Sequence, residues 1–148
     1  MRKKLAAAAI AAVLPLSLAT AGQASAGDVG DSTIFDEGSG SWYHTHGSFT
    51  WFNRTVTVAG YVATGNPAFD NDPKPVTVTR VYFEAYNLAT KVEIQSRSTD
   101  YEASPKSFRF DLSTDRVGGI DRIRITRCGY FGEERLWCDT PKNYSRPF

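Results

Sequence analysis

Apolar and polar residues alternate most regularly in the second half of the chain, between residues 107 and 138. The same spacing occurs in two neighbouring segments, at Phe108, Phe110 and Leu112 and then at Ile123 and Ile125. Successive side chains of a strand point to opposite faces of a sheet, so a period of two predicts half-buried β-strands.

Two earlier segments show the same pattern. In residues 48–63 the alternating apolar residues are Phe49, Trp51, Val56, Val58 and Val62. In residues 76–98 the apolar phase changes, and we expect a β-bulge near Thr79 and Arg80. A turn at 87–90 then leads to a strand in which Val92 and Ile94 are predicted to face the core while the charged residues between them face water.

The remaining segments are polar. Residues 27–47 are rich in Gly, Ser and Asp, so we expect a flexible N-terminal arm with at most one edge strand. Residues 64–75 contain three prolines and are expected to form a surface loop. With about six to eight short strands and no long amphipathic helical pattern, residues 48–148 are predicted to fold as one all-β domain, an antiparallel β-sandwich, with a small β-barrel as the alternative.

Residues 1–26 have the three parts of a secretory signal peptide. Cationic Arg2-Lys3-Lys4 precedes an apolar run from Leu5 to Leu18, and Ala24-Ser25-Ala26 is a small-residue cleavage site. The run is shorter than the ~20 residues that span a bilayer. We therefore expect an exported, extracellular protein that begins at Gly27 and has no membrane association after cleavage.

Charge changes the picture little. The chain has 17 Lys and Arg against 16 Asp and Glu, and removal of the three signal cations leaves 14 against 16, a net charge of −2. Nucleic-acid binding normally needs a basic excess, so we expect no nucleic-acid partner.

The two cysteines, Cys128 and Cys138, are predicted to form a structural disulfide, because an exported chain meets an oxidising environment. Their pairing across a hairpin sets Gly129 opposite Trp137 and leaves a three-residue turn at 132–134, where Gly132 suits a positive φ.

Both histidines lie in one short motif, Trp42-Tyr43-His44-Thr45-His46. Positions i and i+2 of a strand point the same way, so His44 and His46 are candidate metal ligands, with Asp36 or Glu37 as a third. The more general alternative is a pair of exposed histidines beside a flexible arm.

Aromatic residues suggest a different chemistry. Flat rings on a β-surface complement the apolar face of a sugar, and the candidates for this purpose are Trp42, Tyr43, Tyr61, Tyr82 and Tyr86. Arg109, Arg122 and Arg124 are expected to form a ladder on adjoining strands, partly neutralised by Glu84 and Asp111. A solvated face with cross-strand ion pairs is the simpler interpretation of that ladder.

Several features together resemble small secreted β-domain proteins of actinobacteria. They are the Ala-rich signal, Phe108-Arg109-Phe110, the segment from Gly119 to Ile125 and the late cysteine pair. The resemblance implies export and a compact β-domain, and it carries over no functional residue.

The residues favour a non-catalytic protein over an enzyme, with no cofactor. We expect a binding module for an extracellular ligand such as a polysaccharide. One alternative is a metal-dependent hydrolase that uses His44 and His46, and another is a secreted inhibitor or toxin whose disulfide-held hairpin from Gly129 to Trp137 binds a protein partner.

Overall fold

A computed structural model describes residues 30–38 and 42–148, and the expected signal peptide lies outside these residues. The described part contains nine strands and one short 3-10 helix. They are β1 (Asp31–Glu37), β2 (Tyr43–Trp51), β3 (Thr55–Thr64), η1 (Pro67–Phe69), β4 (Val78–Asn87), β5 (Thr90–Asp100), β6 (Lys106–Ser113), β7 (Arg122–Phe131), β8 (Glu134–Cys138) and β9 (Lys142–Ser145).

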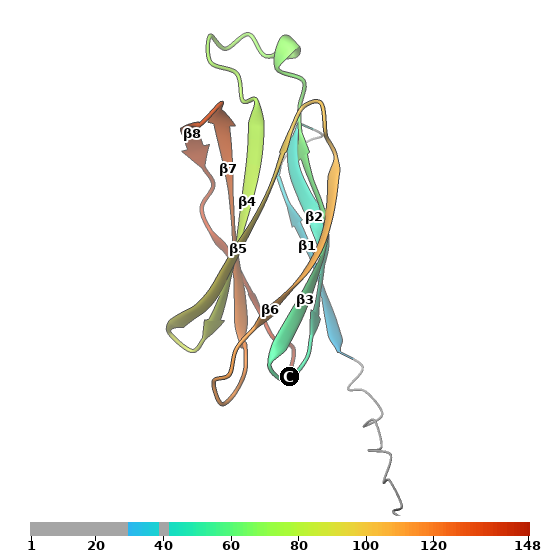
Figure 1. Cartoon of the computed structure of the whole chain (residues 1–148), viewed down its shortest axis with the longest axis vertical. Helices are drawn as coiled ribbons and strands as arrows, with labels where there is room; N and C mark the ends of the chain where they lie inside the picture. Colours follow the sequence, from blue (N-terminus) through green and yellow to red (C-terminus); the bar gives the residue numbers. More distant parts are fainter. Residues whose placement is uncertain (1–29, 39–41) are drawn as a thin grey trace, which may run out of the picture.

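These strands form two antiparallel sheets that face each other (Figure 1). Sheet A has the order β1-β2-β3-β6, and sheet B has the order β5-β4-β7-β8, with β9 also paired to β7. The β-sandwich prediction is confirmed, and the sheets do not close into the alternative barrel. The loop with η1 joins β3 to β4 at the end of the sandwich where the β7–β8 hairpin turns.

The core lies between the sheets and is dominated by phenylalanines and β-branched residues. The Phe35 and Phe49 rings of sheet A are 4.8 Å apart, and Phe83 of sheet B meets the Phe108 ring at 5.4 Å. Burial of one such side chain contributes roughly 1.5–3 kcal/mol. The alternation in residues 48–63 and 107–125 therefore predicted the core-facing positions correctly.

The expected N-terminal arm is shorter than the sequence suggests. Its described residues contain an edge strand, β1, as expected, but they also contain the start of β2, which begins at Tyr43. Phe35 is fully buried and Glu37 is 6% exposed. The boundary expected at Ser48 is thus too late, because residues on both sides of the 39–41 gap belong to sheet A.

From Glu93 onward, strand β5 has the opposite facing from the one expected. The register of β4 and β5 shifts by one residue between Ala85 and Tyr86, and no shift occurs at the bulge expected near Thr79 and Arg80. Val92 packs against the core as predicted, but Ile94 is 50% exposed on the outer face.

The polar residues of β5 consequently point toward sheet A. The Arg97 guanidinium lies 3.9 Å from the centre of the Phe110 ring on β6, and Glu93 accepts a hydrogen bond from the Ser113 amide at 2.6 Å. Gln95 bridges Glu93 and Arg97. These contacts close the open side of the sandwich with polar groups rather than apolar ones.

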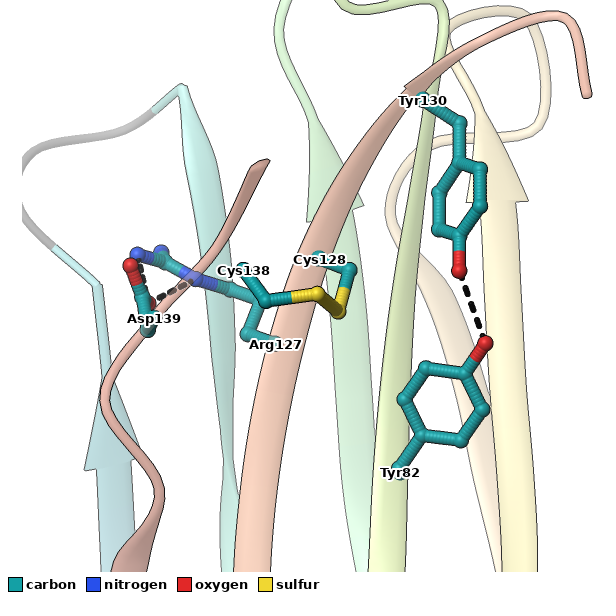
Figure 2. The surroundings of a disulfide bond; sticks show 6 residues. All are labelled: Tyr82, Arg127, Cys128, Tyr130, Cys138 and Asp139. Carbon is teal, nitrogen blue, oxygen red and sulfur yellow. Dashed lines mark hydrogen bonds and ion pairs between the residues drawn. A yellow bond between two sulfur atoms is a disulfide. The ribbon is translucent and has the colours of Figure 1, made fainter. Parts of the chain in front are cut away.

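Cys128 and Cys138 form the predicted disulfide, which joins β7 to β8 (Figure 2). Gly129 lies opposite Trp137 as predicted. The register then shifts at Tyr130, so Phe131 pairs with Glu134 and the turn has two residues instead of three. Gly132 takes the expected positive φ, at 58°.

Candidate functional site

The five candidate aromatic residues do not form one surface. Tyr61 lies opposite His46 on the outer face of sheet A, whereas Tyr82 and Tyr86 lie on the outer face of sheet B. Tyr86 is only 7% exposed, because Arg122 and Arg124 stack over its ring at 4.4 and 5.0 Å. The prediction that Tyr86 offers a ring to a sugar is therefore wrong.

Trp42 and Tyr43 lie at the start of β2, where the chain meets the loop that follows β3. Tyr43 points toward sheet B and meets Trp137 of β8, with ring centres 5.9 Å apart and planes at 68°. Trp42 points to the other side and packs edge-on against Phe69 of η1, 6.1 Å away. Trp42 is 42% exposed and Phe69 is 72% exposed.

Trp137 is held by the residue opposite it. A β-carbon on Gly129 would lie 2.5 Å from Cε2 of the indole, so only glycine leaves room for the ring. The guanidinium of Arg127, a residue of β7, lies 5.4 Å from the centre of the indole ring. On β8 the disulfide fixes Cys138, the residue that follows Trp137. The indole is thus positioned by rigid strands rather than by a loop.

Tyr43 and Trp137 separate two adjoining hollows, and we call this region the aromatic groove. The larger hollow has a volume of about 520 Å³ and is lined also by Asp70, Asp72 and Lys74. The smaller hollow, of about 340 Å³, is completed by Arg127 and Asp139. Both hollows therefore combine aromatic walls with charged hydrogen-bonding groups.

The acidic residues of the larger hollow are fixed by turns. Asp70 Oδ1 accepts the Asp72 amide at 3.1 Å, and Asp72 Oδ1 accepts the Lys74 amide at 3.0 Å. The Tyr43 hydroxyl donates to Asp70 Oδ2 at 3.3 Å. Burial, together with the Asp70 charge, raises the pKa of Tyr43.

An ionic cluster formed by Arg127 and Asp139 lines the smaller hollow of the groove. Arg127, only 8% exposed, donates to Asp139 through Nε at 2.8 Å and Nη2 at 2.5 Å (Figure 2).

Glu37 connects the two sheets next to this cluster. It pairs with Lys142 at 2.6 Å and accepts a hydrogen bond from the Tyr144 hydroxyl. Burial, reinforced by the Glu37 charge, raises the pKa of Tyr144 well above its usual range. Sheet A and β9 are thereby joined by a buried carboxylate with two donors.

The two histidines share the outer face of sheet A, as predicted. His44 Nε2 lies 2.5 Å from Asp36 Oδ1 and its Nδ1 lies 3.3 Å from the Tyr61 hydroxyl, while His46 Nδ1 is 3.9 Å from Asp36 Oδ2. The hydrogen bond from His44 lowers the pKa of Asp36.

The metal alternative gains no support from this arrangement. The structure brings Asp36 to the histidines, but within residues 30–38 and 42–148 no group of three His, Cys, Asp or Glu side chains is arranged to hold a metal ion. Glu37, the other suggested ligand, points into the sandwich.

Most residues of the groove, among them Trp137, Asp70 and Asp72, were not singled out as sugar-binding residues from the sequence. From the sequence, Trp137 was placed only in the disulfide-held hairpin, and Asp70 and Asp72 lie in the surface loop expected at residues 64–75, where Asp is typical of turns. The turns are present, and their carboxylates also line the hollow. The position of Trp137 could have been predicted from the glycine opposite it in the hairpin. A glycine at that place leaves room for the indole ring to lie over the neighbouring strand.

Comparison of the chain with known protein families, curated proteins and solved structures finds no match. In the part of the chain that the structure describes, no helix is long and apolar enough to cross a bilayer. The fold and the disulfide define the protein as a disulfide-bonded β-sandwich, and its function has to be argued from the groove.

Proposed function

We propose that this protein is a secreted, non-catalytic β-sandwich that binds a polysaccharide in the aromatic groove. The observation that carries the proposal is the placement of Tyr43 and Trp137 beside fixed carboxylates. Aromatic faces complement the C–H faces of sugars, and carboxylates accept hydrogen bonds from sugar hydroxyls.

The rigidity of the groove supports binding of a flexible polymer. Trp137 lies on a disulfide-linked strand, and the Asp70 and Asp72 side chains are fixed by their own backbone bonds. A preorganised site loses little side-chain entropy when a ligand binds, so even a small groove gives useful affinity. Export and an extracellular location agree with the disulfide.

The test is affinity electrophoresis of the oxidised protein through gels that contain neutral polysaccharides, such as β-glucans, mannans and xylans. We expect Trp137→Ala to weaken retention at least tenfold, a loss of about 1.4 kcal/mol. Gly129→Ala should weaken it as well, because the new methyl group displaces the indole.

Val117→Ala is the matched control, since Val117 is 89% exposed in the loop before β7, outside the groove. Its retention should equal that of the wild type. Retention of Trp137→Ala at the wild-type level, or no retention of the wild type by any neutral polymer, would refute the proposal.

A further inference from the structure

The outer face of sheet B, which we call the basic face, carries an excess of positive charge. Residues directly opposite one another in an antiparallel pair share a face, and the pairing of β4 with β5 and β7, and of β7 with β8, assigns the charged residues. The basic ones are Arg80, Lys91, Arg122, Arg124 and Arg135, and the acidic ones are Glu84 and Asp100. Five positive against two negative charges give this face a formal charge of +3, although the mature chain is predicted to be slightly negative.

Part of this charge is neutralised on the face itself. Glu84 pairs with Lys91 at 2.8 Å and with Arg124 at 2.6 Å. Within the described residues Arg80, Arg122 and Arg135 have no carboxylate partner, and Nε of Arg122 is buried without a hydrogen-bond acceptor. The sequence predicted a ladder of Arg109 with Arg122 and Arg124, but Arg109 lies on β6 in the other sheet.

Two tyrosines lie among the unpaired arginines. The Tyr82 and Tyr130 hydroxyls point toward each other and are 2.8 Å apart (Figure 2). One hydroxyl donates to the other, so the pair retains one hydrogen that can be donated to a ligand. The Arg80 guanidinium lies 4.9 Å from the centre of the Tyr130 ring. Arg135 of β8 lies directly opposite Tyr130 of β7 in the strand register.

Positive charge from Arg80 and Arg135 lies next to the tyrosine pair. Burial alone would raise the pKa of Tyr82, but hydrogen bonds from Tyr130 and Arg80 and the charges of Arg80 and Arg135 outweigh it and lower the pKa. Burial and the hydrogen bond to Tyr82 raise the pKa of Tyr130, so the two hydroxyls shift in opposite directions, and the positive potential at the pair comes from the neighbouring Arg80 and Arg135. A ligand oxyanion at this place would experience the same potential.

We propose that the basic face binds the carboxylate groups of an acidic polysaccharide, with Arg80 and Arg135 as charge partners and the Tyr82–Tyr130 pair as hydrogen-bond donor. Arginine forks match planar carboxylates in a bidentate manner. The half-buried Tyr82 ring offers apolar contact to the sugar, whereas the Tyr130 ring is buried and contributes only its hydroxyl. The proposal rests on the proposed function for the polymer class, but it uses a surface separate from the groove.

A neighbouring hollow of about 350 Å³ is a weaker candidate for the same ligand. It is lined by Arg80 and Lys106 but also by Asp100 and Glu133. Its two positive charges are balanced by two negative ones, so the charge excess lies over the tyrosine pair rather than in the hollow.

The test is calorimetric titration of the oxidised full-length mature protein with polygalacturonate oligomers at low and at physiological salt. We expect the double variant Arg80→Gln/Arg135→Gln to bind at least tenfold more weakly and to lose part of the salt dependence. Tyr82→Phe, which keeps the ring and removes one hydroxyl, should weaken binding several-fold. The matched control Arg109→Gln/Arg116→Gln removes two exposed arginines elsewhere and should change affinity less than twofold.

Three outcomes would overturn the inference. They are equal loss in the control variant, no binding of the wild type at low salt, and equal affinity for an oligonucleotide of the same charge, which would show that the face attracts polyanions without regard to the carboxylate sugar. Trp137→Ala distinguishes this proposal from the groove, because it should keep polygalacturonate affinity while it loses retention by neutral polymers.

Discussion

Removal of the disulfide should cost the protein a large part of its stability. We consider the double variant Cys128→Ala/Cys138→Ala, which deletes the link between β7 and the edge strand β8 and leaves no unpaired thiol. The two cysteines are 10 residues apart, and in the chain-entropy model closing a loop of this length stabilises by about 2.7 kcal/mol. Cys128 is only 1% exposed, so loss of its buried sulfur adds up to about 1 kcal/mol.

The assay is urea unfolding of the variant and of the wild type, with and without reductant. We expect the variant to lose about 3 kcal/mol of unfolding free energy and the reduced wild type to lose nearly as much, because both lack the cross-link. A loss below about 0.5 kcal/mol would refute the reasoning. A large loss in the alanine variant with no change in the reduced wild type would mean that packing of the sulfurs, rather than the cross-link, stabilises β8.

Two further predictions concern single hydrogen-bonding groups. Tyr144→Phe keeps the ring against Phe49 but removes a donor from the buried Glu37 carboxylate, so we expect urea unfolding to show a loss of about 1–3 kcal/mol of unfolding free energy. The control Tyr101→Phe, at an exposed position, should stay within about 0.5 kcal/mol of the wild type. Equal losses in the two variants would contradict this account of Glu37. Burial raises the pKa of Glu84, but the hydrogen bonds from Arg124 and Lys91 lower it by a larger amount, so its pKa in the folded protein lies below the unfolded value of 4.5. Its stabilising contribution is therefore complete above pH 4.5 and is lost as the pH falls through the lower folded pKa. Glu84→Gln should flatten the plot of unfolding free energy against pH in that acid range. If the variant loses stability with falling pH as steeply as the wild type does, this ion pair does not contribute.

Most of the strands and their facing could be predicted from the sequence. Regular alternation around Phe108 and Val58 predicted strands and facing correctly, because the register of β3 and β6 stays regular from end to end and apolar residues fill most of their inner positions. Alternation failed for Ile94, since a one-residue register shift at Ala85 inverts the facing of everything beyond it. No local pattern in β5 announces a shift that is set by its pairing with β4.

The glycine content of residues 27–47 led to the prediction of an arm where the first strands of sheet A lie. Gly47 was read as part of an arm, yet it lies opposite Gly60, and a β-carbon there would be 2.6 Å from the Phe35 ring. The glycine is required by close packing rather than by flexibility, and only the fold shows which of the two applies.

The candidate site was predictable in part. The sequence singled out Tyr43 and the Gly129–Trp137 pair for separate reasons, and it placed His44 and His46 on one face correctly. It could not bring Tyr43 to Trp137, because they are 94 positions apart and belong to different sheets. Long-range contacts of this kind depend on how the two sheets are aligned, which alternation within single strands does not specify.

The inward-facing polar residues of β5 have a consequence for how molecules of this protein behave toward one another. An edge strand with free backbone groups can recruit a strand from a second copy and so start fibril growth. On β5, such a strand would have to extend the sandwich past the charged Glu93 and Arg97 and the polar Gln95, whose side chains already face the interior side of the edge. Continued stacking would bury the charges of Glu93 and Arg97 between growing sheets, so this edge favours separate molecules even at high protein concentration.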